Sequence, residues 1–190
     1  MRPLSFPFCW LGSLLGAALA FGAEAPSWPG IVGEIHGRLE SLPSAPALQW
    51  SLTVTPGESG LPKFAVRAEG EGTLLEAEIE LLAAAPEVVH WWLKTVELDL
   101  ARWSEALAAQ WPALAGATLG GRVRMSGEGE WRDGKVSGQV LVRLSDGRVD
   151  LPAKKLTLEG LEFALQIDDL AARHTAPAQV FTLRGGHYDT

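Results

Sequence analysis

Cysteine and basic residues are scarce in this sequence, and each scarcity removes a class of function. The one cysteine, Cys9, lies within the first ten residues, so the rest of the chain can form neither an internal disulfide nor a cysteine-based metal site. Only 16 lysines and arginines oppose 23 aspartates and glutamates, which gives a net charge of -7. Because nucleic-acid binding depends on clustered basic residues, we expect no nucleic acid among the partners.

Motifs that carry enzyme chemistry are also missing. The sequence contains no His-Glu-x-x-His, no paired cysteines, no Gly-x-Ser-x-Gly and no phosphate-binding loop. The histidines lie far apart and have no partner at metal-ligand spacing; they are His36, His90, His174 and His187. We therefore expect no enzyme, no catalytic residue, no metal site and no cofactor. An exported hydrolase is the minor alternative.

The N-terminus has the pattern of an export signal. Arg2 supplies a positive charge, residues 4–19 are apolar or small, and Ala18-Leu19-Ala20 places small residues where signal peptidase cleaves. Residues 1–20 are therefore predicted to be a signal peptide cleaved after Ala20, which sends the protein to the periplasm. The alternative is an uncleaved anchor in the inner membrane.

The next segments predict a linker followed by a β-meander. Residues 21–46 are rich in Pro, Gly, Ser and Ala, so we expect a linker or an irregular lead-in. Residues 47–100 carry apolar side chains at alternate positions, interrupted by short glycine-rich turns, as in antiparallel strands. Within this segment, residues 88–93 fit either a helix or a strand.

One amphipathic helix is predicted over residues 101–116. Asp99 can cap its N-terminus, and Pro112 and Gly116 can end it. Apolar residues recur every three or four positions, at Leu100, Trp103, Leu107, Trp111 and Leu114.

Residues 117–190 return to strand alternation, with predicted turns at Asp133-Gly134 and Asp146-Gly147. The fold class is therefore mainly β: an antiparallel meander with one apolar face, one wetted face and one amphipathic helix. A single helix cannot cover so many strands. Periodicity alone favours a β-sandwich, in which a second sheet covers the apolar face, because most one-sided sheets pack on another layer.

The second half, about residues 96 to 190, resembles the YdbH-like proteins. These proteins carry the domain historically labelled "dicarboxylate transport" and are related to the AsmA-like and TamB-like envelope proteins. The resemblance lies in the order and spacing of glycine-punctuated strands: Leu114-Ala-Gly-Ala-Thr-Leu-Gly-Gly-Arg-Val, Ser126-Gly-Glu-Gly, Val136-Ser-Gly-Gln-Val-Leu-Val-Arg-Leu-Ser-Asp-Gly, Leu158-Glu-Gly-Leu-Glu-Phe-Ala-Leu-Gln-Ile and Pro177-Ala-Gln-Val-Phe-Thr-Leu-Arg-Gly-Gly.

The resemblance implies a taco-shaped β-groove in the periplasm, lined with apolar side chains and anchored in the inner membrane, that moves phospholipid toward the outer membrane. Members of the family are several hundred residues long, so it also implies that this chain is a fragment with part of a groove. The expected partners are phospholipid acyl chains and inner-membrane or envelope proteins that complete the groove. The alternative function is a periplasmic β-sandwich that acts as a binding or assembly module.

The side chains expected to line the groove share the apolar parity of their strands. They are Trp50, Leu52, Leu75, Ile79, Val123, Val140, Val142 and Leu165.

Overall fold

The protein is described by a computed structural model, which covers residues 32–40, 46–84, 87–111, 114–172 and 174–188. The predicted signal peptide, residues 1–20, lies outside these ranges. Within them, no helix combines the length and the apolar character needed to cross a bilayer.

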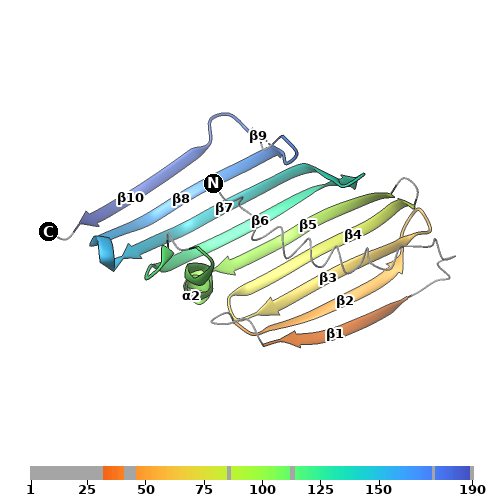
Figure 1. Ribbon diagram of the computed structural model, residues 1–190, viewed down its shortest axis with the longest axis horizontal. Helices are drawn as coiled ribbons and strands as arrows, with labels where there is room; N and C mark the ends of the chain where they lie inside the picture. The colour runs from red at the N-terminus through yellow and green to blue at the C-terminus, as the bar shows by residue number, and fades with distance from the viewer. Residues whose placement is uncertain (1–31, 41–45, 85–86, 112–113, 173, 189–190) are drawn as a thin grey trace.

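The ten strands of the described residues belong to a single sheet that is antiparallel throughout and does not close on itself. Neighbouring strands follow the chain from β1 to β8, then β10 pairs with β8, and the two-residue β9 pairs with the other end of β8 (Figure 1). The predicted antiparallel meander is therefore confirmed. The strands are β1 (Gly33–Leu39), β2 (Leu48–Pro56), β3 (Pro62–Gly70), β4 (Thr73–Ala84), β5 (Glu87–Asp99), β6 (Thr118–Arg132), β7 (Lys135–Leu151), β8 (Leu156–Asp169), β9 (His174–Thr175) and β10 (Val180–Tyr188).

Two short helical elements complete the described residues. The helix α2 (Leu100–Gln110) connects β5 to β6, and a 3-10 helix (Pro152–Lys154) connects β7 to β8. Because β5 pairs with β6, the sheet continues past α2, and the two predicted β segments form one layer. A β-sandwich is wrong for this part of the chain, since no described strand lies in a second sheet.

The register places apolar side chains on one face from one end of the sheet to the other. One row of directly paired residues crosses eight strands: Ile35, Leu52, Val66, Ala77, Leu93, Gly127, Val140 and Ile167. We call the side that carries this row the apolar face and the opposite side the polar face. The buried core lies at the centre of the apolar face, where Ala77, Leu93 and Val96 pack together on β4 and β5.

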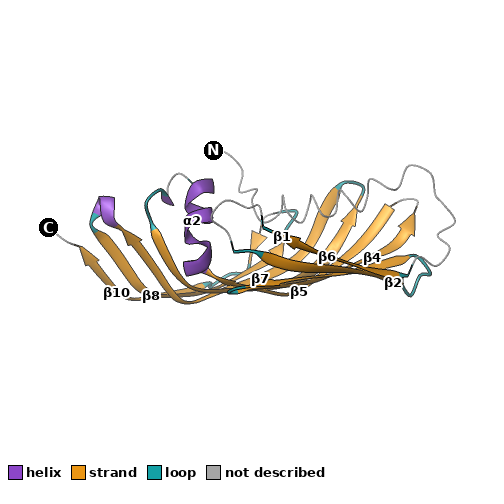
Figure 2. Cartoon of the chain, turned by 90° about the horizontal axis from the view of Figure 1, so that it is seen from below, coloured by secondary structure: helices purple, strands orange, loops and turns teal. Residues whose placement is uncertain are grey.

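The sheet is curved, and α2 stands on its concave side (Figure 2). The indole nitrogen of Trp103 on α2 donates a hydrogen bond of 2.7 Å to Thr73, which is paired with Leu98 on the apolar face. The apolar face is therefore the concave one. Interruptions of the register at Gly121 of β6 and at Asp146 and Gly147 of β7 add local bends, because an extra residue in one strand kinks it.

Residues 33–39 form the strand β1, so the prediction that residues 21–46 are a linker is wrong for this stretch. Gly37 lies opposite Trp50 of β2, and a Cβ at Gly37 would collide with the indole ring. The glycine thus lets the strand approach a large side chain. Glycine also has a low intrinsic strand preference, and it weakens the alternation of apolar and polar side chains by which strands are predicted.

The predicted turn at Asp146-Gly147 is also wrong, because both residues lie inside the continuous strand β7. Asp146 has a φ of 50° and marks a bulge against β8. The turn at Asp133-Gly134 is confirmed: both residues have positive φ, 50° and 75°, and they join β6 to β7.

The helix begins as predicted but ends earlier. The side chain of Asp99 accepts a hydrogen bond of 3.0 Å from the backbone N–H of Ala101, which confirms the N-cap. The helix ends at Gln110 rather than at residue 116, and Trp111 is already extended, with φ -116° and ψ 102°. Trp111 precedes a proline in the sequence, which disfavours the helical conformation at that position. The ambiguous residues 88–93 belong to the strand β5.

Candidate functional site

The structure places all eight predicted groove residues on the apolar face. Val142 of β7 lies between Met125 of β6 and Leu165 of β8, which are its direct cross-strand partners. Ile79 and Val140 are buried, with 8% and 7% of their surface exposed. The others are half-buried: Trp50, Leu52, Leu75, Val123, Val142 and Leu165. These side chains form one surface shared by β2, β4, β6, β7 and β8.

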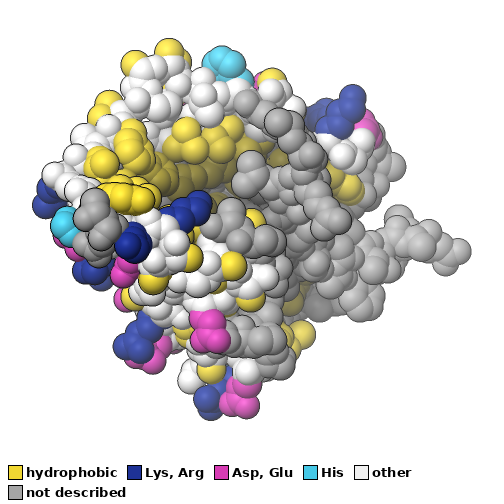
Figure 3. All heavy atoms as spheres, turned by 60° about the vertical axis from the view of Figure 1, so that its left-hand side comes forward, with side chains coloured by type: hydrophobic (Ala, Val, Ile, Leu, Met, Phe, Trp, Pro, Cys, Tyr) yellow, Lys and Arg dark blue, Asp and Glu magenta, His cyan; other side chains and the backbone are white. Residues whose placement is uncertain are grey.

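The apolar face forms a hollow. Seen from the side of β10, hydrophobic side chains gather inside a concave region of the molecule (Figure 3). Exposure rises toward the two edge strands, since Ile35 of β1 is 56% exposed and Phe181 of β10 is 63% exposed. The centre of the sheet is thus better covered than its ends.

Two tryptophan rings lie against glycines on this face. A Cβ on Gly129 would come within 2.6 Å of Cζ2 of Trp91, and one on its cross-strand partner Gly138 within 2.9 Å. Trp50 covers Gly37 in the same way. These glycines were not predicted as part of the site, although a glycine inside a strand often marks a close approach of this kind.

Hydrogen-bonding groups are few on the apolar face. The Thr73 hydroxyl is already engaged by the indole of Trp103. Among the described residues, Nε1 of Trp91 is the buried side-chain polar atom that lacks a hydrogen-bond partner. A ligand on this face would therefore be held mainly by apolar contacts.

The helix α2 is fixed to the sheet by a buried serine. The hydroxyl of Ser104 accepts a hydrogen bond of 2.8 Å from the backbone N–H of Leu119 on β6 and donates one of 3.4 Å to the carbonyl of Ala117. The Trp103–Thr73 bond adds a second attachment, to β4. Neither Ser104 nor Thr73 was predicted as a site residue, because helical periodicity does not reveal which polar side chains contact the sheet.

The polar face carries ion pairs that cross the strands. Lys63 of β3 lies 2.8 Å from Glu78 of β4, and Lys94 of β5 contacts the same carboxylate. The hydrogen bonds from Lys63 and Lys94 lower the pKa of Glu78, and the bond to Glu78 raises the pKa of Lys63. On the polar face, these lysines and Glu78 thus neutralise one another across neighbouring strands.

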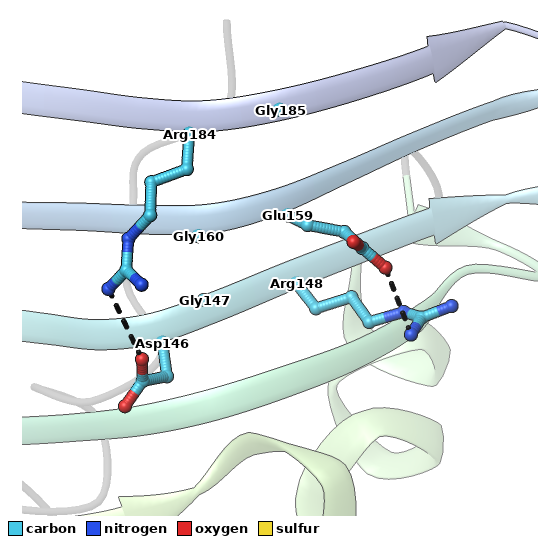
Figure 4. A pocket seen from close by; sticks show the side chains of 7 residues that line it. All are labelled: Asp146, Gly147, Arg148, Glu159, Gly160, Arg184 and Gly185. Atoms are coloured by element: carbon cyan, nitrogen blue, oxygen red, sulfur yellow. Dashed lines mark ion pairs between the residues drawn. The ribbon is translucent and has the colours of Figure 1, made fainter.

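A shallow pocket of about 420 Å³ lies on the polar side of β7, β8 and β10 (Figure 4). Arg184 extends across Gly160 to Asp146, at 3.5 Å, and also contacts Glu162. Arg148 and Glu159 form a further pair at 3.1 Å, so the charged groups that line the pocket bind one another. Figure 4 shows Arg184–Asp146 and Arg148–Glu159 as two separate pairs. Each pair joins two different strands, so these charged groups hold the strands to one another.

No group of three or more His, Cys, Asp or Glu side chains within the described ranges is placed to hold a metal ion. Asp168 and Asp169 lie next to each other at the end of β8, where Asp169 accepts hydrogen bonds from the backbone of Ala171 and Ala172. That carboxylate stabilises the turn that follows the strand.

In comparisons with known proteins, no family model, no curated protein and no solved structure matches this chain. These comparisons therefore assign no function to the chain, and its apolar face is the structural feature from which one can be inferred.

Proposed function

We propose that this chain is a non-enzymatic protein of the cell envelope whose apolar face forms part of a β-groove for phospholipid. In this proposal the groove serves transfer of phospholipid between membranes or maintenance of the outer membrane. The observation that carries it is the row of paired residues from Ile35 to Ile167, which makes one continuous apolar face on the concave side of an open sheet.

Acyl chains match this surface in chemistry. Each buried methylene group contributes about 0.8 kcal/mol, so a chain that lies along several strands gains substantial free energy without any specific hydrogen bond. Large contiguous apolar patches are rare on soluble monomers and mark sites of interaction. The lipid head group, in contrast, finds no charged partner in the apolar row and would remain in water.

The resemblance of the second half of the sequence to the YdbH-like proteins supports the same proposal. It also supports a periplasmic location, an attachment to the inner membrane and further envelope proteins that complete the groove. The alternative is a binding or assembly module whose apolar face is covered by another protein rather than by lipid.

Lipid extraction from natively purified protein tests the proposal. The protein is expressed with its own N-terminal segment, purified without detergent, and examined by native mass spectrometry and by lipid analysis of an organic extract. We expect bound phospholipid, and we expect lipid-stripped protein to take up a fluorescent phospholipid from vesicles. Protein that carries no lipid and takes none up from vesicles contradicts the proposal and favours the assembly module.

A further inference from the structure

The two edge strands of the sheet differ in character. All residues of β10 are exposed, and its large apolar side chains include Val180, Phe181 and Leu183, at 65%, 63% and 47% exposure. The strand contains no proline, lysine or acidic residue, and its one arginine, Arg184, is directed inward to Glu162 and Asp146. No described strand pairs with the outer side of β10. It therefore lacks the features that usually prevent an edge strand from pairing.

The opposite edge, β1, carries charge along its length. Glu34, His36 and Arg38 alternate on the polar side, with Glu34 3.7 Å from His36 and Arg38 2.7 Å from Glu40. Charged side chains on an edge oppose the addition of another strand. The molecule thus has one edge suited to pairing and one edge protected from it.

The direction of the edge strands restricts how copies of the chain can join. Nine of the ten strands lie on one antiparallel path, with β1 first and β10 last, so these two strands run in the same direction. Stacking copies head to tail would place β10 beside β1 of the next copy as a parallel pair, which this otherwise antiparallel sheet does not contain. A two-fold axis instead places β10 antiparallel to β10 of the second copy.

We propose that two copies of this chain pair through β10, about a two-fold axis perpendicular to the sheet. Such an axis keeps both apolar faces on the same side. In a register centred on Thr182, Phe181 of one copy lies opposite Leu183 of the second copy, and Val180 lies opposite Arg184, so no like charges meet. The stacked rings of Phe163 and Phe181, 6.4 Å apart, then border the joint on each side.

The result is a closed dimer, because the same strand is used by both copies and the protected β1 edges lie outermost. It joins two apolar faces into one continuous surface. The dimer follows from the edge geometry and does not depend on whether the apolar face binds lipid.

Sedimentation of paired edge variants tests the dimer. Phe181→Lys places a lysine on β10, and Ile35→Lys makes the same kind of change on the apolar side of β1, at similar exposure. We expect the wild type and Ile35→Lys to dimerise alike over a wide concentration range. Phe181→Lys should associate at least about tenfold more weakly, because each lysine replaces an apolar contact with Leu183 of the second copy and the two lysines become diagonal neighbours across the axis. Thermal melting shows whether each variant is folded.

Hydrogen exchange of the wild type gives a test that needs no variant. The amides of β10 should become more protected as protein concentration rises, while those of β1 should not change. A wild type that stays monomeric, a weakening of association that is equal in the two variants, or oligomers that grow with concentration would each overturn the dimer. Lipid content is measured on the same samples, so a lipid-loaded monomer would refute the dimer alone.

Discussion

Single glycines determine how closely the strands of the apolar face approach one another. Gly129 and Gly138 are cross-strand partners, and a Cβ on Gly129 would come within 2.7 Å of the Cα of Gly138 as well as against the ring of Trp91. Real Cβ atoms do not come so close, so β6 and β7 or the indole would have to move.

Gly129→Ala should therefore destabilise the protein by about 1 to 3 kcal/mol, the usual cost of overpacking. Gly185→Ala is the matched control, because a Cβ on Gly185 of β10 meets no atom within 4 Å. Urea unfolding measures both variants. Equal stability of the two would show that Trp91 and the strand pair are not closely packed at Gly129.

The ion pairs of Glu78 predict a dependence of stability on pH. The side chain of Glu78 is 19% exposed, and the hydrogen bond from Lys63, followed by that from Lys94, lowers its pKa below the ordinary 4.5. A group whose pKa is lower in the folded state stabilises the fold above its unfolded pKa, and this stabilisation is lost as pH falls through the folded pKa.

Glu78→Gln should melt at a lower temperature than the wild type at neutral pH, with a loss of up to about 1 kcal/mol. The difference should shrink as pH falls below 4.5 and disappear below the folded-state pKa of Glu78. Glu105→Gln, on the exposed surface of α2, is the control. A difference that stays constant down to strongly acidic pH would show that the effect is not electrostatic.

At the scale of the elements, alternation predicted the central strands and their faces because the sheet is antiparallel with one wetted side. The eight groove residues share a face for the same reason. Asp99 was predicted as a helix cap because the cap is a local hydrogen bond. These features all depend on residues close to one another in the sequence.

Two kinds of feature were not predicted from the sequence. Some depend on contacts between residues far apart in the chain, and others have a local sequence that fits two different structures equally well. An Asp-Gly pair suits both a hairpin turn and a bulge, because each needs positive φ; only the pairing of β7 on both sides distinguishes Asp146-Gly147 from Asp133-Gly134. The strand β1 has glycine at alternate positions on its apolar side, at Gly33 and Gly37, so its alternation is weak. The curvature and the side of the sheet on which α2 lies leave no periodic signal.

The attachment of α2 to the sheet should depend on Ser104. Replacing it by alanine leaves the buried N–H of Leu119 without its acceptor, which costs about 1 to 3 kcal/mol. Hydrogen exchange should show faster exchange in α2 of Ser104→Ala, and urea unfolding should show the loss of stability. Ser126→Ala, at an exposed position of β6, should leave both unchanged. Unaltered protection of α2 in Ser104→Ala would mean that other contacts hold the helix.

At the scale of the molecule, the described residues form a single curved sheet with a polar side and an apolar side. The ion pairs lie on the polar, convex side, and the row of paired residues from Ile35 to Ile167 lies on the apolar, concave side. Figure 2 shows the curvature, and Figure 3 shows hydrophobic side chains inside the hollow. Among the described residues, the helix α2 stands over this face. An apolar face of this kind fits either a groove for lipid or a core covered by another protein. The two differ in how a charged side chain introduced on this face would affect lipid binding and stability.

The most direct measurement of the proposed function compares Val142→Asp with Leu141→Asp for phospholipid binding and melting temperature. The two residues are neighbours on β7 and both are half-buried, but Val142 lies on the apolar face and Leu141, paired with Ser126 and Gln166, lies on the polar face. If the concave face binds acyl chains, Val142→Asp should lose lipid and Leu141→Asp should keep it, with melting temperatures close to each other. A wild type without lipid, together with unfolding of Val142→Asp alone, would contradict the groove, because an unpaired carboxylate costs several kcal/mol only where it is sealed from water.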